Sequence, residues 1–166
     1  IESEYAIAMH PSFAEVETPS VCRETPVTVW LGKTDNLPFA HKELAGLRSL
    51  FRNVEVIDSI QEARSSLRGE IQLLHVISHA VHRGQNPMFS SIEFADGPLF
   101  AMEIAGSQGD VGLAVLSACE TGTMSVAIRD EPDGLARAFL ACGAQSVIGS
   151  QWPLDDEAAA IQFVAF

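Results

Sequence analysis

A cysteine and a histidine in this chain occupy positions suited to nucleophilic chemistry. The segment 117–122, which contains Cys119 and ends in a glycine, follows directly on the apolar run 113–116. A cysteine just past a buried strand can project its sulfur above a sheet, where its own backbone N–H can face a substrate carbonyl oxygen. A free thiol titrates near ~8.5, so a cysteine nucleophile at neutral pH needs a base that takes its proton.

His79 is the candidate base, because it follows the apolar run 71–77 in the same way. An imidazole beside the thiol can accept its proton and then donate it to a leaving amine. Two groups suffice for that cycle, and spacing alone names no orienting acid. His75 lies inside the run, which is typical of a packed or hydrogen-bonded histidine, and His82 in the following loop is the second choice. The structural alternative for the pair is a small core cysteine and a hydrogen-bonded histidine.

These residues need a framework that brings strand ends together. From Pro26 onward the sequence predicts alternating elements, with strands over 27–31, 54–57, 71–77, 113–116 and 146–148, and helices over 40–51, 60–67, 133–142 and from 155. Asp35 and Asn36 are the expected caps of the first helix, and Asp96-Gly97 predicts a hairpin. Continuous apolar strands between helices indicate an α/β fold with a mostly parallel sheet covered on both faces. In such sheets, sites form at the carboxyl ends of the strands, where both candidates fall.

Several blocks resemble the CHAT domain family, which is grouped with caspases, separases and gingipains in peptidase clan CD. They are residues 75–80, 113–122, 134–141, 146–156, 37–44 and, more loosely, 5–12. The resemblance implies a three-layer fold of caspase-hemoglobinase type over residues 25–166, preceded by an N-terminal extension or edge segment over 1–24. The first residue is not Met and the last apolar segment runs to Phe166. We therefore interpret the chain as part of a larger protein, and we expect the C-terminal elements of the domain to be absent from the 166 residues given.

The resemblance also implies the roles of individual residues. Cys119 falls on the family's nucleophile and His79 on the histidine of its His-Gly motif. The backbone N–H groups of Cys119 and Ala80 would form the oxyanion hole. The family usually has glycine where this chain has Ala80, so the N–H is retained, a methyl group is added and a positive φ becomes costly.

The resemblance also implies that an acidic pair near the end of the chain selects the substrate. By resemblance to separase-like relatives, Asp156, with Asp155 as its neighbour, lines the pocket for a basic P1 side chain, and a carboxylate there selects Arg or Lys through a charge-assisted contact. Both residues also suit the cap of the following helix, and the two roles are compatible. Glu120 shapes the nucleophile loop or faces the substrate.

The function that these features imply is a cysteine endopeptidase with a Cys-His dyad, which cleaves a protein substrate after a basic residue without a metal or organic cofactor. The resemblance also implies a regulatory protein partner or fused interaction modules such as TPR arrays, and a role in bacterial defence. The alternative is a catalytically inactive scaffold or signalling domain, which Ala80 and the end of the chain at Phe166 favour. A flavodoxin-like ligand-binding domain is a third interpretation, which no Gly-rich phosphate loop supports.

Composition narrows the partners and the location. The formal net charge of −12 opposes binding to phosphate backbones and anionic lipids, so we expect no direct contact with nucleic acid or membranes. The three cysteines, Cys22, Cys119 and Cys142, form neither a disulfide framework nor a zinc-type spacing, which indicates a reducing, cytoplasmic setting. No signal peptide is recognised, and no apolar run approaches the ~20 residues of a membrane span.

Overall fold

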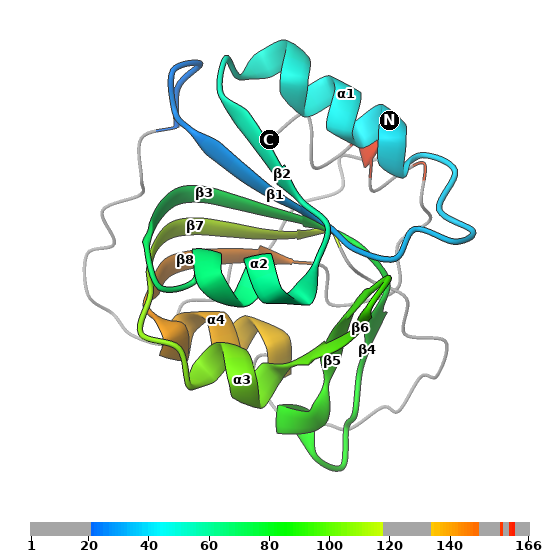
Figure 1. The fold of residues 1–166 in the computed structure, drawn as a ribbon, viewed down its shortest axis with the longest axis vertical. Coiled ribbons are helices and arrows are strands. Elements are labelled where there is room, and N and C mark those ends of the chain that lie inside the picture. Colours follow the sequence, from blue (N-terminus) through cyan, green and yellow to red (C-terminus); the bar gives the residue numbers. More distant parts are fainter. Residues whose placement is uncertain (1–20, 118–133, 150–156, 158–159, 162–166) are drawn as a thin grey trace, which may run out of the picture.

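A parallel β-sheet forms the centre of the molecule (Figure 1). The computed structural model describes residues 21–117, 134–149, 157, 160 and 161. Within them the strand order is β2-β1-β3-β7-β8, and every neighbouring pair is parallel. The strands are β1 (Val27–Leu31), β2 (Val54–Ile57), β3 (Glu70–Ile77), β7 (Asp110–Ser117) and β8 (Ala144–Gly149). The predicted mostly parallel sheet is confirmed.

Helices cover both faces of this sheet (Figure 1). One face packs against α1 (Ala40–Leu50) through Val29, Leu73 and Val115, which join Leu44 and Leu47 of the helix in one core cluster. The opposite face packs against α2 (Ile60–Ser66), α3 (Ala101–Ala105) and α4 (Gly134–Cys142) in a larger cluster. Side chains that alternate along each strand supply the two clusters. The expected three-layer architecture is therefore confirmed, and it is consistent with a caspase-like fold.

A small antiparallel sheet follows β3 along the chain. It consists of β4 (Ala80–Val81), β5 (Ser91–Phe94) and β6 (Gly97–Phe100) in the order β4-β5-β6, and a short helical turn, η1 (Pro87–Phe89), precedes β5. The predicted hairpin around Asp96-Gly97 is confirmed, and Gly97 has the positive φ of 135° that glycine readily adopts.

The start of α1 differs from the prediction. Its N-cap is Phe39, which makes no side-chain cap hydrogen bond, so Asp35 and Asn36 do not cap the helix. Asn36 instead has a φ of 64°, in a turn where the Leu37 N–H donates to the Thr34 carbonyl. A short polar side chain tolerates this left-handed conformation, so Asn36 serves the turn that leads into the helix.

Two further observations concern the helices. Of the helix predicted from residue 155, the structure describes Glu157, Ala160 and Ile161, all of which are helical. Among the described residues, no helix combines the length and the apolar character needed to cross a membrane.

Candidate active site

The two central strands end in register at the edge where the catalytic residues were expected. The last paired position of β3 and β7 joins Ile77 to Ser117, and the Ser78 N–H donates to the Ser117 carbonyl over 3.4 Å. His79 is the second residue after Ile77, and Cys119 is the second residue after Ser117. The two strands therefore end at the same level of the sheet, and each candidate residue follows the end of its strand by two positions in the sequence.

The described part of the chain includes two of the expected site residues, His79 and Ala80. Cys119, Glu120, Asp155 and Asp156 lie outside the described residues.

The backbone of His79 is fixed on both sides. Its N–H donates to the Lys33 carbonyl over 3.1 Å, and its carbonyl accepts from the Glu93 N–H over 2.9 Å. The half-buried ring places Nε2 against the backbone carbonyl of Asp35. A carbonyl can only accept a hydrogen bond, so this contact assigns the proton of the neutral imidazole to Nε2 and leaves the lone pair on Nδ1. The Asp35 carbonyl is thus an orienting group for the ring, supplied by the backbone.

A glycine allows three segments to meet behind this histidine. The Gly32 N–H donates to the Ile77 carbonyl, and the Lys33 N–H donates to the Glu93 carbonyl over 2.6 Å. A Cβ atom at Gly32 would lie 2.3 Å from Oγ of Ser78 and 2.4 Å from the Glu93 carbonyl oxygen, far inside van der Waals contact. The ends of β1, β3 and β5 can approach this closely only because residue 32 has no side chain.

Ala80 begins strand β4 with its N–H directed away from the neighbouring strand. Ala80 lies opposite Ile92 in the antiparallel pair of β4 and β5. The hydrogen bond from the Glu93 N–H to the His79 carbonyl joins the two residues next to this position, so Ala80 and Ile92 themselves exchange no backbone hydrogen bonds. The methyl group of Ala80 packs in the core, where the residue is 6% exposed. Among the described residues, Asn36 is the one non-glycine with a positive φ, so the added methyl group of Ala80 causes no left-handed strain.

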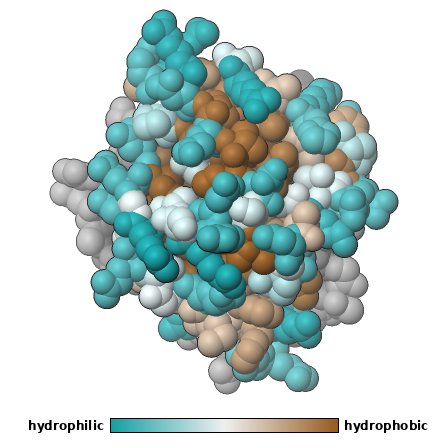
Figure 2. Space-filling model, in the orientation of Figure 1, coloured by the Kyte–Doolittle hydropathy of each residue, from teal (hydrophilic) through white to brown (hydrophobic). Residues whose placement is uncertain are grey.

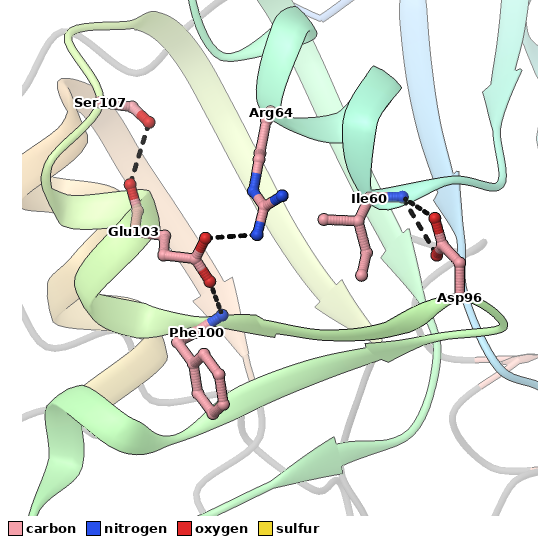
Figure 3. Close-up of polar contacts among 6 residues, drawn as sticks. All are labelled: Ile60, Arg64, Asp96, Phe100, Glu103 and Ser107. Atoms are coloured by element: carbon pink, nitrogen blue, oxygen red, sulfur yellow. Dashed lines mark hydrogen bonds and ion pairs between the residues drawn. The ribbon is translucent and has the colours of Figure 1, made fainter.

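Polar contacts brace the small sheet against α2 and α3 (Figure 3). The carboxylate of Asp96, in the β5–β6 turn, accepts from the Ile60 N–H at 3.1 and 3.2 Å, at the positive end of the helix dipole of α2. Glu103 on α3 pairs with Arg64 of α2 and also accepts from the Phe100 N–H over 3.0 Å. These contacts hold the hairpin that supports β4.

The other two histidines near the site have different surroundings. His75 is buried inside β3, and its Nε2 lies 2.6 Å from Oε1 of Glu43, so the expectation of a hydrogen-bonded strand histidine is confirmed. His82 is half-buried and directly follows β4.

Sequence reasoning missed Glu43, whose second carboxylate oxygen accepts from Oγ of Ser117 over 3.1 Å. The available signal was a charged residue at position 43, within the apolar stripe of α1 formed by Ala40, Leu44 and Leu47. The role of the Asp35 carbonyl had no sequence signal, since every residue carries that group.

The described cysteines and acidic residues limit the alternatives. Cys22 is exposed and Cys142 is buried, and both are free thiols. Burial raises the pKa of the Cys142 thiol, although a hydrogen bond from the Gly109 backbone partly opposes the shift, so Cys142 is a poor nucleophile. Within the described ranges, no group of three or more His, Cys, Asp or Glu side chains could hold a metal ion.

The model of the family described as the CHAT domain matches residues 3–166, which is nearly the whole chain. No curated protein matches the chain.

Proposed function

The chain belongs to the CHAT domain family, which is related to the caspase-like cysteine peptidases, and from this premise we propose that it is a cysteine endopeptidase with Cys119 as nucleophile and His79 as base. The observation that supports the proposal is the pairing of Ile77 with Ser117, because the proposed base and the proposed nucleophile each follow one of these two residues by two positions in the sequence. The orientation of His79 supports the same assignment.

The proposed reaction begins at Nδ1 of His79. With Nε2–H held by the Asp35 carbonyl, Nδ1 accepts the thiol proton of Cys119, and the thiolate attacks the carbonyl carbon of the scissile peptide. The resulting oxyanion accepts hydrogen bonds from the N–H groups of Ala80 and Cys119. The imidazolium then donates its proton to the leaving amine, and water, deprotonated by the imidazole, hydrolyses the acyl-enzyme to restore the thiol.

We also propose a basic P1 side chain for the substrate. Asp156 would pair with the Arg or Lys head group, while Asp155 and Glu120 would add negative potential around the pocket. The formal net charge of −12 favours the approach of a basic peptide in the same way. We further propose that a protein partner or a fused module controls the activity. The proposed setting is a reducing cytoplasm, and the proposed role is in bacterial defence.

A panel of fluorogenic peptides that differ only in having Arg, Lys or Asp at P1 tests the proposed function. We expect turnover of the Arg and Lys peptides, and we expect an irreversible peptidyl inhibitor with Arg at P1 to label Cys119, as located by mass spectrometry. Turnover of the Asp peptide alone would contradict the role given to Asp156. If the inhibitor abolished turnover while it labelled Cys22 or Cys142, the assignment of Cys119 as the nucleophile would be contradicted.

A catalytically inactive scaffold or signalling domain is the second candidate function. The observation in its favour is Ala80, where the family usually has glycine. The extended conformation of Ala80 and the direction of its N–H weigh against it, because both leave the backbone donor in place. No turnover by the intact protein, with or without its partner modules, would favour this second function.

A further inference from the structure

A buried carboxylate on α1 joins the middle of β3 to the end of β7. Glu43 is 2% exposed, and its two oxygens contact different strands: Oε1 lies 2.6 Å from Nε2 of His75, and Oε2 accepts from Oγ of Ser117 over 3.1 Å. His75 is 1% exposed. The three side chains thus form a polar cluster between α1 and the sheet, in which Glu43 and His75 are buried and Ser117 is half-buried.

Packing alone gives no reason for this cluster. Position 43 lies among the buried residues of α1, where an apolar side chain would continue the stripe. Burying a carboxylate and an imidazole is costly unless each is well paired, and replacement by apolar residues is often neutral or stabilising. The contacts of Glu43 therefore point to a task other than stability.

The cluster does not have the geometry of a serine nucleophile with its base. The contacts run from His75 to Glu43 to Ser117, so the carboxylate, and not the imidazole, faces the hydroxyl. What the cluster does determine is the conformation of Ser117. Its hydroxyl is tied to α1 and its carbonyl is tied to the Ser78 N–H, at the last paired position of β7.

We propose that Glu43, oriented by His75, is a positioning residue that fixes Ser117, the second residue before Cys119. The inference rests on the proposed function for its purpose, because the position of Ser117 matters in this way only if Cys119 is the nucleophile. A tether on both the side chain and the backbone of Ser117 limits rotation two residues before the sulfur. Loss of the tether is expected to separate the thiol from His79 and so to weaken stabilisation of the thiolate.

The test measures the reactivity of Cys119 and does not depend on turnover. All variants carry Cys22→Ser, which removes the exposed thiol, and mass spectrometry reads the label on Cys119. The rate of alkylation by iodoacetamide is followed from pH 5 to 10 in this background and in Ser117→Ala. We expect Ser117→Ala to move the midpoint upward and to slow alkylation at pH 7 by about 5-fold or more.

Two further variants separate positioning from general stability. Ser117→Thr keeps the hydroxyl and is expected to react within about 2-fold of the background. Ser66→Ala removes the acceptor of the Trp30 indole N–H, a 3.2 Å hydrogen bond on the other side of the sheet. It should lower the melting temperature while the alkylation midpoint stays unchanged. If Ser117→Ala does not fold, Ser117→Thr and Ser117→Val form the matched pair that differs in the hydroxyl.

The outcomes distinguish this inference from the proposed function. An unchanged midpoint and rate in folded Ser117→Ala would overturn the positioning role, even if the protein is an active Cys119-dependent peptidase. An upward shift in Ser117→Ala that Ser117→Thr reverses would support it, even if no peptide is cleaved. A shift of the same size in Ser66→Ala would assign the effect to stability and would also overturn the inference.

Discussion

Ile77 of β3 and Ser117 of β7 lie opposite each other at the last paired position of two adjacent parallel strands. This pairing fixes the level at which both strands end, and the Ser78 N–H to Ser117 carbonyl bond extends it by one residue. Parallel strands present their carboxyl ends at one edge of the sheet, where α/β proteins place their sites. The register of the central sheet therefore supports the proposed pairing of His79 with Cys119.

Replacement of His79 tests the base. We expect His79→Ala to lower kcat by about 10²- to 10⁴-fold with little change in KM, because general-base assistance is lost while substrate binding is kept. His82→Ala is the matched control, and we expect it to keep kcat near the wild-type value. A kcat that falls in His82→Ala and not in His79→Ala would assign the base to His82.

Gly32 is expected to be essential for the support of His79. Gly32→Ala would set a Cβ atom 2.4 Å from the Glu93 carbonyl oxygen, a backbone atom that cannot move aside cheaply. We expect a loss of about 1–3 kcal/mol in the free energy of unfolding, measured by urea denaturation, together with a lower kcat.

Gly69→Ala is the matched control for this change. The nearest atom to a Cβ at Gly69 is the Ser66 carbonyl oxygen at 3.6 Å, an ordinary contact. We expect its free energy of unfolding to lie within about 0.5 kcal/mol of wild type. Equal stability of the two alanine variants would contradict the close approach of β1, β3 and β5 behind the histidine.

The predicted bounds of some strands agree with the structure, and those of others do not. Strands β1 and β2 match the predicted ranges 27–31 and 54–57. Each is a short, mostly apolar run, which Pro26 and Gly32 bound in β1 and Asn53 and Asp58 bound in β2. Strand β7 was predicted over 113–116 and spans Asp110–Ser117. The sequence did not predict the start of β7, because Gly112 lies there and glycine is typical of loops. In the structure, Gly112 allows the Gln72 carbonyl of β3 to approach, since a Cβ atom at residue 112 would lie 2.6 Å from that oxygen.

The site residues divide in the same way. Local motifs and family resemblance predicted roles for His79 and Ala80, whose surroundings the structure describes. Those roles, like the roles of Cys119, Glu120, Asp155 and Asp156, remain predictions. Glu43 contacts residues 32 and 74 positions away in the chain, which no local pattern encodes. Element types follow from local periodicity, whereas partners across the sheet follow from the topology that packs α1 over β3 and β7.

The turn of the β5–β6 hairpin should contribute measurably to stability. Asp96→Ala removes both carboxylate contacts with the Ile60 N–H and the charge at the start of α2, so we expect a loss of about 1–2 kcal/mol in the free energy of unfolding. Asp96→Asn keeps one oxygen acceptor and should lose less. Urea denaturation measures both, and a larger loss in Asp96→Asn than in Asp96→Ala would contradict this account.

The acidic pair near the end of the chain predicts a change in specificity. If Asp156 pairs with the P1 head group, Asp156→Asn should lower kcat/KM for an Arg peptide by about 10- to 100-fold, the value of a charge-assisted hydrogen bond. Asp155→Asn is the comparison, and we expect a smaller effect. A larger loss in Asp155→Asn would transfer the pocket role to Asp155.

Cys119 is the residue to which the proposed peptidase activity is assigned. The direct measurement is the steady-state hydrolysis of a fluorogenic peptide with Arg at P1 by the wild type, by Cys119→Ala and by the double variant Cys22→Ser, Cys142→Ser. We predict turnover by the wild type, turnover that persists in the double variant when it is folded, and none above background in Cys119→Ala. Turnover that survives Cys119→Ala would contradict the account.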